Sequence, residues 1–96
     1  MSPANKKKID LLRIKLDRLD TDLLKLIKKR SNLVNDVLKV KIHKKEIIDQ
    51  RRISFILKKI REKSIQLKID PKISKRIWKN MIWSFIDYEK RNFKKK

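Results

Sequence analysis

The chain has 96 residues and a formal net charge of +19, and it contains no Gly, no Cys and only two Pro. The absence of Cys excludes disulfides and thiolate metal sites, and with one His a zinc site is not expected. The absence of Gly and the presence of only two Pro predict an all-α protein with short connections, built as a single domain over residues 1–96. No apolar run approaches the roughly 20 residues that span a bilayer, and no apolar segment follows the N-terminal lysines, so we expect a cytoplasmic protein.

The high positive charge has two interpretations. A polyanion partner, either nucleic acid or a membrane surface, is one of them. However, 22 of the 30 cations are Lys and they are spread over every segment, as coding bias in an AT-rich genome would produce. We therefore favour compositional bias. Nucleic acid is not an expected partner, and a non-enzymatic, basic helical protein that binds nucleic acid is kept only as a less favoured alternative.

The first predicted element is a helix over residues 9–41. Its apolar seam recurs every three or four residues, which is typical of a helix buried along one face. Nine of the ten seam positions are aliphatic and the tenth is Arg30: Ile9, Leu12, Leu16, Leu19, Leu23, Leu26, Arg30, Leu33, Val37 and Val40. A guanidinium in such a seam requires an anion, which is either a protein carboxylate or a ligand.

The length of this helix predicts a second chain. Thirty-three helical residues span roughly 50 Å. A compact domain of this size has a radius of gyration of only about 12–13 Å, so we expect a second copy to cover the helix in a homodimer. Residues 1–8 and 92–96 are expected to be flexible tails.

Three cations of the first helix are candidate ligand-binding residues. Arg30 and Lys41 are almost three turns apart and point in nearly the same direction, so they could frame a small dianion. A solvated lysine at the helix end is the alternative for Lys41. Arg13 lies about 25 Å from Arg30 along the axis and could reach it only from an antiparallel partner chain. The alternative for Arg13 is a surface ion pair with Asp10 or Asp17.

Two further helices follow a polar break at residues 43–46. The second should run from about Ile48 to Leu67, with Ile53, Ile56, Leu57 and Ile60 on its inner side. Asp70-Pro71 predicts the start of the third, because Asp caps helices and Pro favours the first helical position. Two apolar stripes follow, one with Ile73, Ile77, Met81, Phe85 and Tyr88, the other with Trp78, Ile82, Phe85 and Glu89.

Polar residues also occur on the inner faces of these helices. Arg52 lies on an inner stripe between Ile48 and Ile56, and its spacing from Asp49 allows an i,i+3 salt bridge. Glu89 faces inward on the third helix. It either pairs with Arg30, which is a purely structural solution, or is partly desolvated, which favours its protonated form.

The combined pattern resembles the all-helical chorismate mutases. It consists of Leu-Arg13-x5-Leu19-Asp20-x9-Arg30-x10-Lys41, then Asp49-x-x-Arg52, then Asp70-Pro71 and an inward polar residue at Glu89, over about residues 9–91. Each piece alone is common in helices. Their combination with a long Gly-free first helix is specific.

The resemblance implies an intertwined homodimer of three-helix chains that converts chorismate to prephenate in aromatic amino acid biosynthesis, without a cofactor. Arg30 and Arg13 of the partner subunit would bind substrate carboxylate. Arg52 would supply a cation at the other end of the substrate. Lys41 and Glu89 would hydrogen-bond the ether oxygen, with Asp49 near the ring hydroxyl. Lys41, Glu89 and Arg30 are thus the expected catalytic residues.

Two positions depart from the mutase pattern. Many of these enzymes have Glu directly after the second-helix arginine, where this chain has Ile53, and a small polar residue where it has Phe85. Both changes resemble the isochorismate-pyruvate lyases of the same fold, which are apolar or aromatic there. Asp49 and the pattern around Lys41 still suit a mutase, so lyase activity is kept as the alternative.

Overall fold

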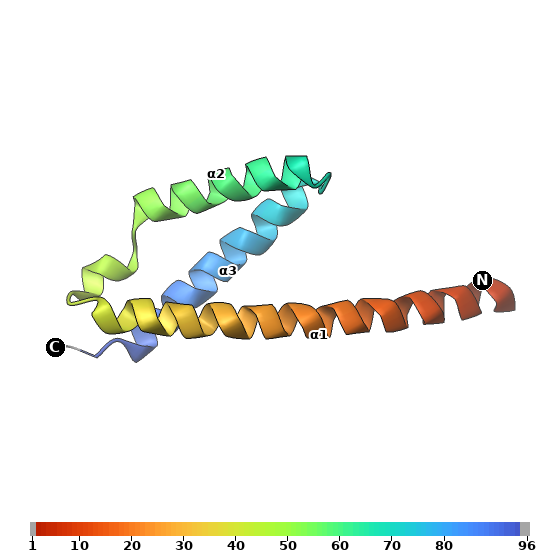
Figure 1. Cartoon of the computed structure of the whole chain (residues 1–96), viewed down its shortest axis with the longest axis horizontal. Coiled ribbons are helices and arrows are strands. Elements are labelled where there is room, and N and C mark those ends of the chain that lie inside the picture. Colours follow the sequence, from red (N-terminus) through yellow and green to blue (C-terminus); the bar gives the residue numbers. More distant parts are fainter. Residues whose placement is uncertain (1, 95–96) are drawn as a thin grey trace. The chain divides into compact units, whose positions relative to one another are not determined.

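The computed structural model describes residues 2–94, and these form an all-helical chain, which confirms the predicted class. The elements are α1 (Pro3–Val40), the 3-10 turn η1 (Lys44–Ile47), α2 (Gln50–Gln66) and α3 (Pro71–Asn92) (Figure 1). Along residues 2–94, no helix combines the length and apolar character that crossing a membrane requires.

Helix α1 begins at Pro3, six residues before its predicted start at Ile9. The Ser2 hydroxyl accepts a hydrogen bond from Asn5 N at 3.2 Å, and Pro3 occupies the first helical position. This local start signal precedes the apolar seam, so periodicity alone could not find it. Residues 3–8, expected to be a tail, are helical, while Met1 and residues 95–96 of the predicted tails lie outside the described residues.

The chain divides after Leu33 into two compact units. In the first unit, α1 carries the apolar seam, and its leucines are more than half exposed in the single chain: Leu12, Leu16, Leu19, Leu23 and Leu26. No buried residue lies in this part of α1.

The core of the second unit joins the end of α1 to η1, α2 and α3. Its buried members are Leu38, Ile47, Ile82 and Ile86, and Ile53, Ile56, Leu57 and Phe93 pack against them. Three of the four residues predicted for the inner face of α2 therefore pack against this core, and the fourth, Ile60, is half-buried. On α3 the stripe with Trp78, Ile82 and Glu89 faces inward, whereas Ile73 and Ile77 of the other stripe are about half exposed.

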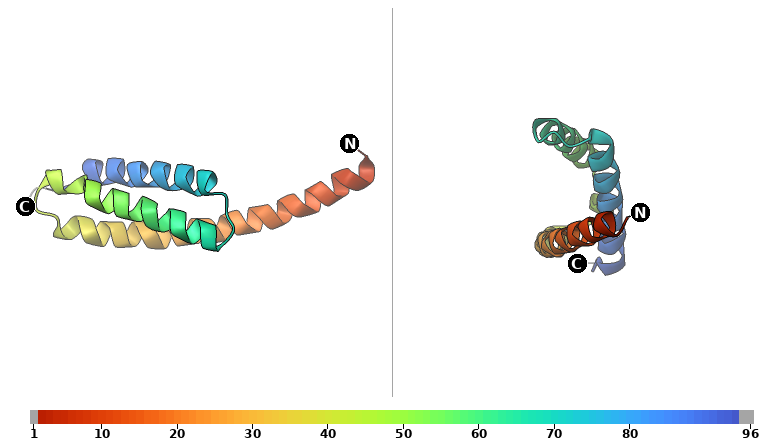
Figure 2. Two further views of the ribbon diagram at one scale, coloured as in Figure 1. Left: turned by 90° about the horizontal axis from the view of Figure 1, so that it is seen from above. Right: turned by 90° about the vertical axis from the view of Figure 1, so that its right-hand side faces the viewer.

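A tight connection joins α2 to α3, which run antiparallel as neighbours (Figures 1 and 2). Ile69 N donates to Ser64 O at 2.8 Å and Lys68 N donates to Ile65 O at 3.1 Å, which closes α2 with Lys68 in the left-handed region (φ 58°). The Asp70 carboxylate accepts from Lys72 N at 2.9 Å and Pro71 follows it, as predicted.

Two buried serines bring the helices together near this connection. Ser64 and Ser74 are only 4% and 5% exposed, and their hydroxyl oxygens lie 2.7 Å apart. The Ser64 hydroxyl also lies 2.6 Å from Ile60 O, so both polar groups are satisfied without water. The small side chains permit a close approach of α2 and α3.

Candidate functional site

Lys41 and Glu89 form an ion pair in the second unit, with 3.3 Å between Lys41 Nζ and Glu89 Oε1. Lys41 directly follows the end of α1, where its backbone N donates to Leu38 O at 3.2 Å. Glu89 lies one turn after the buried Ile86 on α3, so the stripe that builds the core also turns its carboxylate inward.

The pair is largely shielded from water, since the side chains of Lys41 and Glu89 are 17% and 8% exposed. The inward position predicted for Glu89 is confirmed, and the alternative of a solvated Lys41 is wrong. Two buried charges persist only when each is compensated, so each holds the other in place. An ammonium has three N–H donors, which leaves Lys41 capable of binding a further acceptor beside Glu89.

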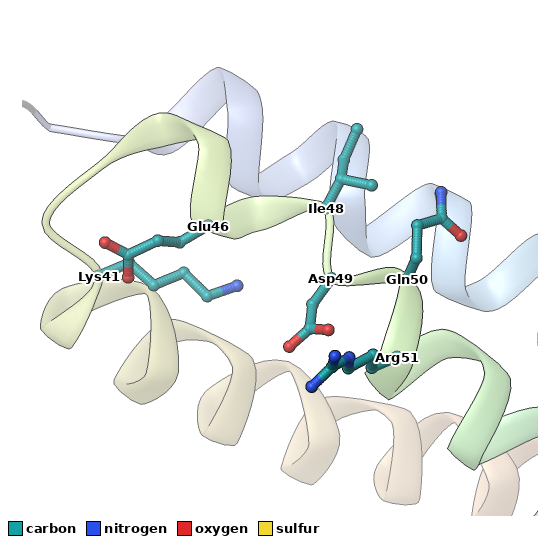
Figure 3. Close-up of a pocket in the computed structure, with 6 residues that line it drawn as sticks. All are labelled: Lys41, Glu46, Ile48, Asp49, Gln50 and Arg51. Atoms are coloured by element: carbon teal, nitrogen blue, oxygen red, sulfur yellow. The ribbon is translucent and has the colours of Figure 1, made fainter.

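A pocket of about 430 Å³ opens next to Lys41. This volume lies within the range of about 300–1,000 Å³ typical of small-molecule sites. Its lining combines two cations with two carboxylates: Lys41, Glu46, Ile48, Asp49, Gln50 and Arg51. Figure 3 shows the Lys41 ammonium and the Arg51 guanidinium both turned toward the side where the Asp49 carboxylate lies.

The two acidic residues of the pocket also order its backbone. Glu46 Oε1 accepts from His43 N at 3.0 Å, which holds η1 closed. Asp49 caps α2, and its Oδ1 accepts from Arg52 N at 3.0 Å. The predicted i,i+3 interaction of Asp49 is thus made with the backbone of Arg52 and not with its guanidinium.

Arg52 is exposed, which corrects its predicted inward position. Its guanidinium carbon lies 5.2 Å from the centroid of the Phe55 ring, and it does not line the pocket. The inner stripe of α2 begins at Ile53, and one residue along a helix turns the side chain by about 100°. Arg52 therefore points to a different face.

Arg51 lines the pocket although no motif singled it out. A signal was available in the sequence, because Arg51 and Arg52 are adjacent cations in the first turn of α2. The helix dipole disfavours positive charge at an N-terminus. Two adjacent arginines at that position are therefore an unusual feature that the sequence itself displays.

The remaining predicted site residues have different surroundings. Ile53 and Phe85 are half-buried in the second unit, and Ile53 packs against the core. Arg30 and Arg13 belong to the first unit. Arg30 is half-buried, while Arg13 is exposed and its guanidinium lies 4.0 Å from the Asp10 carboxylate, the surface ion pair considered for it.

Comparison with known proteins gives one result. A family model described as chorismate mutase type II matches residues 12–90. The matched span runs from the first turns of α1 almost to the end of α3 and contains all eight predicted site residues. No curated protein and no solved structure matches the chain.

Proposed function

The chain belongs to the chorismate mutase type II family, and we propose that it rearranges chorismate to prephenate. The observation that carries this proposal is the buried pair of Lys41 and Glu89. It brings a fixed ammonium and a carboxyl group to the inner side of the second unit, next to a pocket of ligand size.

The reaction is a pericyclic rearrangement in which a C–O bond of the ether breaks as a C–C bond forms. It requires no nucleophile, so the protein contributes by confining the flexible dianion in its compact reactive geometry. Negative charge grows on the ether oxygen during bond breaking. Lys41 supplies an N–H donor to that oxygen, and a preorganised donor of this kind is a large contributor to rate.

Glu89 acts at the same oxygen only when it is protonated. As a carboxylate it can only accept, and it then accepts from Lys41. Once protonated it donates its O–H to the ether oxygen beside the Lys41 ammonium. We propose that this form of Glu89 is the active one.

Binding of the two substrate carboxylates is assigned to arginines. Arg30 would bind one of them together with Arg13 of the partner subunit. For the cation at the other end of the substrate, the resemblance points to Arg52. Arg51 is a second candidate because it lines the pocket beside Lys41. Asp49 would lie near the ring hydroxyl, with Ile53 and Phe85 against the ring.

The site as proposed is completed in an intertwined homodimer. This is supported by the exposed leucine seam of α1, which leaves a long apolar face uncovered in the single chain. It is also supported by the distance of about 25 Å that separates Arg13 from Arg30 along one helix.

The second candidate is isochorismate-pyruvate lyase activity, favoured by Ile53 and Phe85 at positions that are polar in many mutases. Each substrate would be offered to the purified protein and the products identified. We expect chorismate to disappear with formation of prephenate. Formation of salicylate and pyruvate from isochorismate, with chorismate unchanged, would favour the lyase, and turnover of neither would refute both.

A further inference from the structure

A second cavity, of about 500 Å³, lies in the second unit between α2 and α3. It shares no lining residue with the pocket beside Lys41. Its lining is formed by Ser54, Leu57, Lys58, Ile60, Arg61, Pro71, Lys75 and Lys79, and we name it the α2/α3 groove.

The α2/α3 groove combines an apolar floor with a cationic rim. Leu57, Ile60 and Pro71 are half-buried and form the floor. Four of the eight lining residues are exposed cations and none is acidic. Within residues 2–94 none of these four cations forms an ion pair, whereas Lys59 on the same helix is paired with Glu62 at 3.7 Å.

The helical spacing places these cations in two rows. Lys75 and Lys79 are one turn apart on α3, about 6 Å along its axis, and Lys58 and Arg61 are about 4.5 Å apart on α2. Uncompensated like charges at such spacing repel one another. An anionic ligand removes this repulsion, and the concave apolar floor can cover its uncharged part.

We propose that the α2/α3 groove binds a small organic polyanion, with an apolar ring or chain and at least two carboxylate, sulfonate or phosphate groups. The apolar part would lie on Leu57, Ile60 and Pro71. The anionic groups would be bound by the cation rows of α2 and α3. This site is additional to the proposed catalytic one.

Naphthalene-1,5-disulfonate is a suitable probe, because it has an apolar ring system and two anionic groups. It would be titrated into the full chain at constant ionic strength and followed by amide chemical shifts. We expect saturable shifts in residues 54–61 and 72–79. Lys75→Gln with Lys79→Gln should weaken binding by at least about tenfold, since two charge-assisted contacts are lost.

The control is Lys63→Gln with Lys72→Gln, which removes the same charge from exposed positions of α2 and α3 outside the groove. It should change the affinity by less than about threefold. An equal loss in both double variants would show a general charge effect and overturn the proposal. Chemical-shift changes confined to residues 41–52 would also overturn the proposal. Equally strong binding of inorganic sulfate would do the same, because sulfate has no apolar part.

Discussion

Lys41 places an ammonium 3.3 Å from the Glu89 carboxylate, in a position where less than a fifth of either side chain is exposed. This contact fixes the direction of a long and otherwise flexible side chain. A donor that is already oriented requires no reorganisation when charge develops on the substrate, which is the basis of its proposed contribution.

Replacement of Lys41 tests that contribution. Lys41→Ala should lower kcat by about 10²–10³, the usual loss for one preorganised donor, while the oligomeric state is unchanged. Steady-state kinetics with chorismate would measure this. Lys39→Ala, at an exposed position two residues earlier, is the matched control and should retain near-normal turnover. Near-normal turnover of Lys41→Ala would remove Lys41 from the site.

The proposed role of Glu89 as a hydrogen-bond donor predicts that an amide can replace its carboxyl group. Glu89→Gln presents an N–H donor at this position and should retain turnover, whereas Glu89→Ala should lower kcat by about 10²–10³. Steady-state kinetics with chorismate would measure both variants. An equal loss in Glu89→Gln and Glu89→Ala would contradict donation by Glu89.

The two arginines at the start of α2 can be separated by parallel substitutions. Arg51 lines the pocket beside Lys41, whereas the Arg52 guanidinium lies over the Phe55 ring. Arg51→Ala should therefore raise KM for chorismate by about tenfold or more, as expected for loss of a charge-assisted contact. Arg52→Ala should have the smaller effect. A larger increase in KM for Arg52→Ala than for Arg51→Ala would instead assign substrate binding to Arg52.

Helical periodicity found the inward side chain of Glu89 but not its partner, and only the family resemblance placed Lys41 and Glu89 at the same substrate atom. Helical periodicity places a residue on a face, so the stripe shared with Ile82 was sufficient. The partner depends on packing between segments 48 residues apart, which periodicity does not encode. Arg51 was missed for a related reason, because it belongs to a pocket and to no apolar stripe.

At the scale of the elements, the helix boundaries that local sequence signals mark were predicted best. Asp70-Pro71 marked the start of α3 correctly because the cap and the proline act within one turn. The start of α2 was expected at Ile48 and lies at Gln50, after the Asp49 cap. The buried contact of Ser64 with Ser74 had no sequence signal, since two serines ten residues apart are unremarkable until the helices meet.

The end of α2 offers a stabilising substitution. Lys68 has φ 58°, and a residue with a Cβ pays roughly 1 kcal/mol for this conformation. Lys68→Gly should therefore raise Tm by a few degrees in thermal unfolding. Lys63→Gly, inside α2, should lower Tm instead, because helical Gly costs about 0.5–1 kcal/mol. A decrease in Tm for Lys68→Gly would show that its side chain contributes more than the backbone costs.

At the scale of the whole molecule, the exposed seam of α1 predicts association of two chains. Leu16 and Leu23 are both more than half exposed. Burial of one such side chain contributes about 1.5–3 kcal/mol of association free energy. In a two-fold dimer each residue occurs twice, so its contribution is made twice. Leu16→Gln with Leu23→Gln should shift the protein toward monomer in sedimentation equilibrium. Turnover should fall with the dimer, because Arg13 of the partner subunit is then missing.

The control for this change is Thr21→Gln with Asn32→Gln, at exposed α1 positions outside the seam. This control should leave unchanged both the mass of the assembly in sedimentation equilibrium and the turnover of chorismate. A monomeric parent protein with full activity would refute the dimer while leaving the assignment to the mutase family intact.

Among residues 2–94, Lys68 is the one non-glycine residue with positive φ, in a sequence that has no glycine at all. A chain without glycine explores fewer backbone conformations when it is unfolded, so it loses less entropy on folding. Among the described residues of the second unit, the buried apolar side chains are Leu38, Ile47, Ile82 and Ile86. Such a small core can stabilise the folded chain partly because the unfolded chain has fewer conformations available to it.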